Sequence, residues 1–292
     1  LILCLIGFCQ SPSFALLDCW VLESSYLAKD NFGSIRAFGS IGWGLSTLIF
    51  GYAIDIIGYR IIPGLFIIFS FFVLFIALNT KDAEKHQATH SSINFHDIKE
   101  LLHNTRYIHL VVIFLLIYIN FNSTVMISLT LLNQLSGKAS DVGIFTFIAA
   151  WSEIPILLVA RKLLIRIDQK KLLIISIVFF LLRTTLTYFA NSSSFIIALS
   201  LLQMFSFGIF IFISKYLVDE INPPHLKTSS QTIVMSASSG LSGFLSYTAT
   251  GALLDLIGIS NTIIVSSCVS LLALFLSIWY YRLSKTKKLV TV

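Results

Sequence analysis

Two ionisable side chains near the start of the 292-residue chain lie inside long apolar stretches. Asp18 and Arg36 occupy two such stretches, which are joined by one short polar loop. An ionisable group near the centre of a bilayer costs about 2.5 to 3.5 kcal/mol on insertion scales, so it needs a partner or a water-filled cavity. Because a short loop makes consecutive helices antiparallel neighbours, Asp18 and Arg36 form a candidate ion pair.

One face of the helix predicted around Arg36 combines hydrogen-bonding groups with an aromatic ring. Helical spacing of i, i+4, i+7 and i+11 places on this face Arg36, Ser40, Trp43 and Thr47. A sugar matches this chemistry, because a guanidinium and the Asp18 carboxylate can bind its hydroxyls while a flat ring packs against its apolar face. The same spacing also fits a structural salt bridge beside a packing tryptophan.

A second candidate pair lies in the second half of the chain. Glu153 and Arg183 lie in successive apolar stretches, and Pro155 is expected to kink the helix that carries Glu153. A carboxylate whose proton affinity is raised by desolvation and lowered by a neighbouring arginine is suited to carrying a coupled proton. An ion pair that orders two helices is the alternative interpretation.

Uncharged polar residues inside the apolar stretches are candidates to line a water-filled path. Hydrogen bonding between helices explains such residues equally well. The candidates for lining a cavity are Ser40, Asn120, Thr124, Gln203 and Ser206.

The composition excludes a soluble globular enzyme. Hydrophobic residues make up 56% of the chain, charged residues only 12%, and the mean hydropathy is +0.88. Apolar runs long enough to cross a bilayer recur throughout, so the expected class is an all-α polytopic membrane protein. The predicted spans are 1–25, 31–57, 60–79, 107–134, 141–164, 171–190, 194–218, 229–256 and 259–281.

The distribution of basic residues predicts how the chain is oriented. Fifteen Lys and Arg residues lie at the loops on one side of the predicted spans, and only Arg60 and Lys138 lie on the other. The positive-inside rule therefore places the long loop at 80–106 and the tail at 282–292 in the cytoplasm of a cell-membrane protein. An outward-facing N-terminus then predicts three further helices upstream. The net charge of +6 belongs to these loops and does not indicate nucleic-acid binding.

The sequence contains no motif typical of an enzyme or a metal site. It has no phosphate-binding glycine loop, nucleophile elbow or HExxH motif, and its four cysteines lack metal-ligand spacing. We therefore expect no catalytic residues, no metal and no cofactor. An enzyme acting inside the membrane would need a nucleophile or a metal set, and the sequence offers neither.

A short internal repeat suggests two related halves. Segment 51–58 (GYAIDIIG) and segment 251–258 (GALLDLIG) share a glycine, an aspartate and a second glycine at the same spacing, each at the end of a predicted span. Parallel repeats of this kind are typical of transporters built from two helical bundles.

The most specific signal is a resemblance to a known family. Segment 7–25 (GFCQSPSFALLDCWVLESS) and segment 31–58 (NFGSIRAFGSIGWGLSTLIFGYAIDIIG) resemble the fourth and fifth helices of the major facilitator superfamily, in particular proton symporters similar to lactose permease. In those proteins the residues matching Asp18 and Arg36 bind the sugar, and the one matching Trp43 stacks on its ring.

The resemblance continues to the C-terminus and implies a fold. Glu153 matches a glutamate of the eighth helix that contributes to the sugar site, and Arg183 resembles a ninth-helix arginine of proton coupling. The nine spans then correspond to helices four to twelve of a twelve-helix fold of two six-helix bundles. The implied divisions are 1–79 (helices four to six), the cytoplasmic loop 80–106, the C-terminal bundle 107–281 and the tail 282–292.

Gln203 and Ser206 depart from the sugar symporters, which have a histidine and a proton-carrying glutamate at these positions. Coupling is therefore expected to use Glu153 or Asp18. Together these features predict a monomeric secondary active transporter that binds a small polar solute and protons within a lipid bilayer, with uptake of a sugar or oligosaccharide. Related branches similar to nucleoside or aromatic-acid permeases share the aspartate and arginine and remain an alternative, as does an inactive partial gene product.

Overall fold

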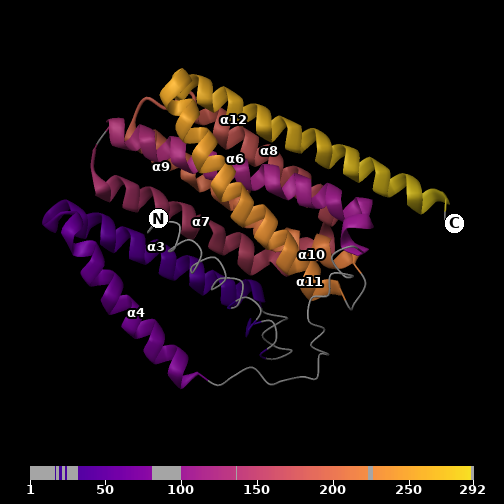
Figure 1. Ribbon diagram of the computed structural model, residues 1–292, viewed down its shortest axis with the longest axis horizontal. Helices are drawn as coiled ribbons and strands as arrows, with labels where there is room; N and C mark the ends of the chain where they lie inside the picture. Colours follow the sequence, from indigo (N-terminus) through magenta and orange to yellow (C-terminus); the bar gives the residue numbers. More distant parts are fainter. Residues whose placement is uncertain are drawn as a thin grey trace.

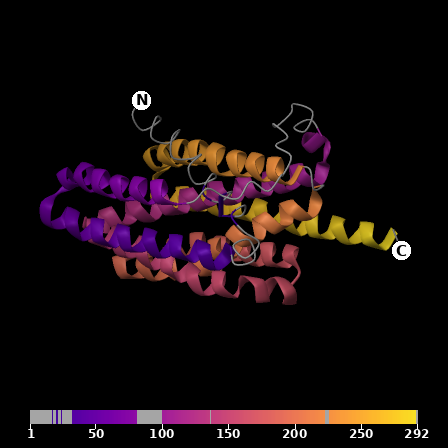
Figure 2. The same cartoon turned by 90° about the horizontal axis from the view of Figure 1, so that it is seen from below.

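The described part of the chain is built from helices. The computed structural model describes residues 32–80, 100–135, 137–222 and 226–290, together with positions 17, 20, 21 and 24, and every element in these ranges is helical. The helices run up and down alongside one another (Figures 1 and 2). This confirms the predicted all-α polytopic architecture. Asp18 lies outside the described residues.

The N-terminal part forms a helical hairpin. Helix α3 (Phe32–Ile57) is followed by a short 3-10 helix, η1 (Tyr59–Ile61), and then by α4 (Ile62–Asn79). The chain turns at Gly58, whose φ of 88° is easily reached only by glycine. Helix α4 buries no residue and exposes apolar side chains all round, as a lipid-facing membrane helix does.

The C-terminal part forms a larger bundle. Its core contains aromatic side chains from several helices, including Phe114 and Phe210, whose ring centroids lie 5.2 Å apart at an interplanar angle of 88°. Its elements are α6 (Thr105–Leu135), α7 (Ala139–Arg166), α8 (Gln169–Thr187), α9 (Ser193–Leu199), the 3-10 helix η2 (Ser200–Met204), α10 (Phe207–Ile221), α11 (Lys227–Met235), the π-helix η4 (Ser236–Leu241) and α12 (Ser242–Val290).

Six helices in the described ranges are long and apolar enough to cross a membrane. They are Ser34–Ile57, Tyr59–Asn79, Thr105–Leu135, Ala139–Arg166, Ser193–Ile221 and Ser230–Ser284. The last contains two predicted spans, 229–256 and 259–281, because the chain reverses direction at Gly258 within α12 (Figure 1). Helix α8 matches the predicted span 171–190 but carries three charged residues. The predicted span 1–25 lies almost wholly outside the described residues, so the number of nine stays a prediction.

The two copies of the internal repeat end in the same backbone turn. Gly58 has φ 88° and ψ 173°, and Gly258 has φ 75° and ψ 172°. In each copy a helix reaches the same end of the bundle, turns at the second glycine and continues as a helix in the opposite direction (Figure 1). The short sequence match therefore has a structural counterpart.

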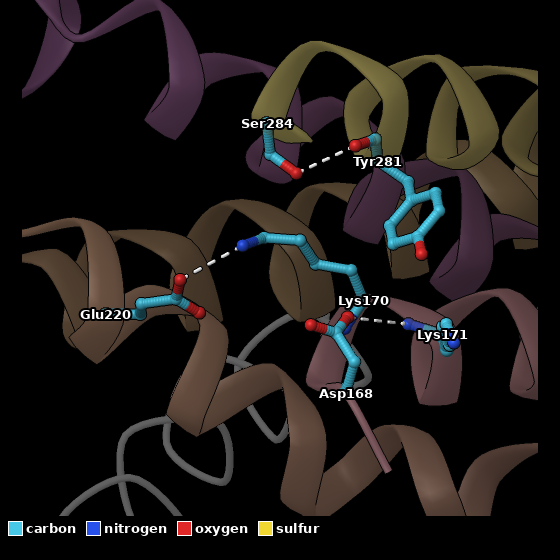
Figure 3. A network of polar contacts seen from close by, with 6 residues as sticks. All are labelled: Asp168, Lys170, Lys171, Glu220, Tyr281 and Ser284. Atoms are coloured by element: carbon cyan, nitrogen blue, oxygen red, sulfur yellow. Dashed lines mark hydrogen bonds and ion pairs between the residues drawn. The ribbon is translucent and has the colours of Figure 1, made fainter. Parts of the chain in front are cut away.

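Figure 3 shows polar contacts among residues of α8, α10 and α12, near the end of the bundle where α8 begins, α10 ends and the C-terminus lies. Asp168 caps α8 by accepting hydrogen bonds from the backbone N–H groups of Lys170, at 2.9 Å, and Lys171, at 3.3 Å. The Lys170 ammonium lies 3.0 Å from the Glu220 carboxylate, which connects α8 to α10.

Basic residues are concentrated at this same end. Arg60 and Lys138 lie at the opposite end, beside the turn at Gly58 and the start of α7. The described basic residues at the helix ends on this side include Arg106 at the start of α6, Arg161, Lys162 and Arg166 in the last turns of α7, Lys170 and Lys171 at the start of α8, and Arg282 in the last part of α12. The basic residues that the sequence assigned to one side of the spans therefore lie at one end of the folded bundle.

Replacing Gly258 with alanine should destabilise the protein by about 1 to 3 kcal/mol, because its φ of 75° and ψ of 172° lie in a region that is essentially restricted to glycine, although nothing lies within 4 Å of the added methyl. The measurement is the thermal unfolding midpoint of purified protein in detergent. Gly243→Ala is the control, since that helical glycine also has open space around it. Equal midpoints for the two variants would contradict the assignment of the turn.

Candidate functional site

The candidate site lies where α3 packs closely against α7, an arrangement seen in both views of the fold (Figures 1 and 2). A Cβ atom on Gly51 would lie 2.8 Å from the Ala139 carbonyl oxygen, and one on Gly143 would lie 2.7 Å from the Thr47 carbonyl oxygen. Only glycine at these two positions allows the backbones to approach so closely. This contact sets the distance between the two helices near one end of the bundle.

An aromatic side chain fills the next part of the α3–α7 interface. A Cβ atom on Gly44 would lie 2.7 Å from Cδ1 of Trp151, so the indole occupies the space beside that glycine. The ring of Phe147 lies 4.8 Å from the Trp151 ring, measured between centroids. Glycine on α3 and aromatic side chains on α7 therefore fix how the two helices are rotated toward each other.

The carboxylate of Glu153 is buried at the centre of this interface. Its side chain is 5% exposed, its Oε1 accepts a hydrogen bond from Nε2 of Gln203 at 2.7 Å, and its Oε2 accepts one from the Ser40 hydroxyl at 3.2 Å. The three residues come from α7, η2 and α3. One carboxylate therefore links three elements through neutral donors.

Arg183 reaches this carboxylate through an amide. Its side chain is 2% exposed, and Nη1 donates to Oε1 of Gln203 at 2.8 Å while the guanidinium lies 5.8 Å from the Phe145 ring centroid. The predicted pair of Glu153 and Arg183 is thus a chain of three side chains, in which Gln203 accepts from the arginine and donates to the glutamate.

The Arg183 side chain retains an unused donor. Its Nη2 is buried and has no hydrogen-bond partner within the described parts of the chain. A buried donor without a partner costs about 1 to 3 kcal/mol, and more when it is charged. An acceptor brought next to this nitrogen would therefore be bound favourably.

Arg36 lies on α3, one helical turn before Ser40. It is partly buried and near enough to Glu153 for electrostatic attraction between their charges. Trp43 lies further along α3 and is 55% exposed. Because Asp18 lies outside the described residues, its predicted pairing with Arg36 stays a prediction.

The helix that supplies Gln203 is broken at that residue. The predicted span 194–218 consists of α9, the 3-10 helix η2 and α10, with Gln203 inside η2 and Ser206 at the start of α10. The Ser206 hydroxyl is buried and donates to the carbonyl of Leu202 at 3.1 Å. A 3-10 segment inside a longer helix is often a functional hinge, and here it directs an amide at the buried charges.

The proline on α7 adds a second irregularity nearby. Pro155 lies inside α7 and has no backbone N–H, so the carbonyl of Trp151 loses its usual helical donor two residues before Glu153. The two buried charged residues therefore lie beside two interruptions of regular α-helical hydrogen bonding, one at Pro155 in α7 and one in the 3-10 helix η2.

Asn120 and Thr124 belong to a separate polar network. Asn120 Nδ2 lies 3.2 Å from the Thr184 hydroxyl and 3.0 Å from the Ser266 carbonyl oxygen, and the Thr124 and Thr184 hydroxyls lie 2.7 Å apart. These contacts join α6, α8 and α12 inside the C-terminal bundle. They are the hydrogen bonds between helices that the sequence left open as an alternative to cavity lining.

Two features of the site are missed by sequence reasoning. Gln203 is expected only to line a cavity, whereas it connects two charged residues. The Gly51–Gly143 contact joins residues 92 positions apart and has no pattern within either helix. A polar amide in an otherwise apolar span is the one signal that points to Gln203.

Replacing Gln203 with alanine should lower the free energy of unfolding by about 3 kcal/mol, because it leaves both Glu153 and Arg183 buried without their best partner. Chemical denaturation in detergent measures the loss. Gln231→Ala is the control, because that amide bonds to the Lys215 carbonyl and the Asp219 carboxylate without connecting two buried charges. Similar losses for both variants would argue against the role given to Gln203.

Comparison with known proteins identifies the family. The family model described as "MFS_1 like family" matches residues 1–278. The chain is 25% identical over 289 residues to the uncharacterized transporter YwbF of Bacillus subtilis (strain 168), an alignment that covers 97% of the chain and 70% of that protein. It is 24% identical over 253 residues to the maltose permease of Geobacillus stearothermophilus, covering 86% of the chain and 63% of that protein.

These matches extend through both the α3–α4 hairpin and the C-terminal bundle. They agree with the resemblance that was based on the residues around Arg36. The chain, which spans about two thirds of the length of these two relatives, belongs to the MFS_1-like family of the major facilitator superfamily of membrane transporters.

Proposed function

We propose that this protein takes up a small polar solute, a sugar or an oligosaccharide, together with protons. The observation that carries the proposal is the burial of the Glu153 carboxylate between α3 and α7, held by neutral donors and linked through Gln203 to Arg183. The similarity to a protein named maltose permease supports a sugar as the solute. Membership of a transporter family also argues against an enzyme.

The proposed mechanism divides the chain into two halves. Residues 1–79 would belong to the N-terminal bundle and residues 107–281 would form the C-terminal one, so that α3 and α7 come from different halves. Rocking of the halves about a central site gives alternating access in transporters of this type. Ser40 and Glu153 are then partners across the boundary between the halves, at 3.2 Å.

Solute binding is assigned to the α3 side of this boundary. Arg36 and Asp18 would bind the hydroxyls of the solute, and the exposed ring of Trp43 would pack against its apolar face. A guanidinium presents several donors in a fixed fork, which suits neighbouring hydroxyls on a sugar ring.

Proton coupling is assigned to Glu153. A proton on this carboxylate removes its charge, and with it the attraction that Arg36 and Arg183 exert on it. The bonds from Ser40 and Gln203 then weaken, because charge-assisted hydrogen bonds are about twice as strong as neutral ones. Protonation of Glu153 would thus weaken the contacts that α7 makes with α3 and with η2. Because α3 belongs to the other half in this mechanism, proton binding would make it easier for the two halves to move apart.

The proposal includes an orientation. The basic end of the bundle would face the cytoplasm, with the C-terminus on that side of the cell membrane and the turns at Gly58 and Gly258 outside.

A solute with a carboxylate is the second candidate. The unpartnered Nη2 of Arg183 suits an anionic acceptor such as the carboxylate of an aromatic acid better than a neutral hydroxyl. An uptake screen of the full-length protein in proteoliposomes distinguishes the candidates, with sugars, nucleosides and aromatic acids offered with and without an inward proton gradient. Uptake of a sugar that rises with the gradient supports the first proposal, and uptake of an acid alone supports the second. No uptake of any class would contradict both.

Glu153→Gln should abolish gradient-driven accumulation while leaving solute exchange across the membrane, because the amide resembles the protonated carboxyl, accepting from Gln203 and donating to Ser40, but cannot take up or release a proton. Accumulation and counterflow of the transported solute are compared in the same vesicles. Glu220→Gln is the control, since that carboxylate pairs with Lys170 at the end of the bundle. If Glu153→Gln accumulates solute normally, the proton is carried elsewhere.

Arg36→Ala should abolish uptake in cells while leaving the amount of protein in the membrane unchanged, because the substitution removes the forked donor from the proposed binding face. Uptake is measured with radiolabelled solute, and membrane insertion by immunoblot. Arg60→Ala, at the exposed end of the α3–α4 hairpin, is the matched control. Wild-type uptake by Arg36→Ala would remove this residue from the site.

A further inference from the structure

The last turn of α3 carries a carboxylate that caps a helix in the other part of the molecule. Oδ1 of Asp55 accepts a hydrogen bond from the backbone N–H of Ala139 at 2.9 Å, and Oδ2 accepts one from the N–H of Ser140 at 3.0 Å. These two N–H groups open α7 and have no partner within that helix. The cap comes from a residue 84 positions away rather than from the loop before α7.

The charges around this contact favour it. The N-terminus of a helix carries a partial positive charge that attracts a carboxylate, and Lys138 directly before α7 adds a full positive charge nearby. The residue that would ordinarily cap α7 is Lys138, which has no acceptor in its side chain and makes no side-chain cap bond. Asp55 therefore supplies the capping acceptor that the Lys138 side chain cannot provide.

The contact lies beside the closest approach of the two helices. Gly51 is one turn before Asp55, and its Cα lies 3.3 Å from the position that a Cβ on Gly143 would take. When α3 and α7 separate at this end, the Asp55 bonds must break, because each joins a side chain of one helix to the backbone of the other. Asp55 itself is exposed, so water can replace α7 as its partner.

We propose that Asp55 is a latch that holds the two halves together at the end of the bundle carrying Gly58, and that opening this end to the solute requires its carboxylate to leave the α7 N-terminus. The inference rests on the proposed function, because it takes α3 and α7 to belong to different halves. It goes beyond that function by naming the bonds that keep one entrance closed. Asp168 makes the same kind of cap within one half, at the opposite end, and has no such role.

The test measures access to the interface in full-length protein whose native cysteines are replaced by serine. Leu48→Cys is the reporter, since the Leu48 Cα lies 3.5 Å from where a Cβ on Gly143 would be. A membrane-impermeant maleimide is added from each side of the membrane in turn, without solute. Asp55→Ala, which removes both acceptors, should raise the labelling rate several-fold from the side that carries Gly58, and Asp168→Ala should leave it unchanged.

Two further variants separate a latch from a general loss of stability. Ser176→Cys, fully buried in α8, should label slowly whether or not Asp55 is replaced, whereas a merely structural role would raise its labelling together with that of Leu48→Cys. Asp55→Asn keeps one acceptor oxygen at the same reach and should give an intermediate rate at Leu48→Cys, which tests the latch even if Asp55→Ala does not reach the membrane. Equal rates at Leu48→Cys with aspartate and with either replacement would overturn the proposal.

The assay does not depend on knowing the solute. If labelling responds to Asp55 but the uptake screen finds no transported sugar or acid, the latch stands and the proposed function falls. If uptake is coupled to protons but labelling does not respond, the latch falls and the function stands.

Discussion

Charged groups buried among apolar helices must find partners inside the protein, because hydrocarbon offers none. Glu153 and Arg183 meet this requirement through Gln203, which uses its amide oxygen for the cation and its amide nitrogen for the anion. A direct ion pair would satisfy the same two charges with one contact. The amide instead keeps them connected but apart, and it leaves Glu153 free to accept from Ser40 on α3.

The irregular backbone around the site follows from the same requirement. An amide can reach both charges only if its own helix is positioned between them, and the 3-10 segment η2 supplies that position within the span 194–218. Gly208, whose added Cβ would lie 2.7 Å from Cγ2 of Ile156, lets α10 pack closely against α7 beside this segment.

The interface between α3 and α7 combines contacts of different strength along its length. Glycines at one end allow the backbones to approach, and the tryptophan in the middle fills the space beside Gly44. Hydrogen bonds to two carboxylates also cross the interface, one bond to the buried Glu153 and two to the exposed Asp55. Glycines, polar contacts and one indole at this interface would suit the separation of the two helices that the proposed mechanism requires.

The sequence by itself determined the helical class, the charge asymmetry and which ionisable residues lie inside apolar stretches. Hydropathy over about 20 residues is a local property, so spans such as 107–134 and 141–164 could be predicted within a few residues of α6 and α7. The residues around Arg36 also pointed to the superfamily that the comparisons confirm. Only the tertiary structure decided that Gln203 connects Glu153 to Arg183, that Asn120 bonds within the bundle, and that Asp55 caps α7. These contacts join helices far apart in the chain, and no period or spacing within one helix specifies which face of another will meet it.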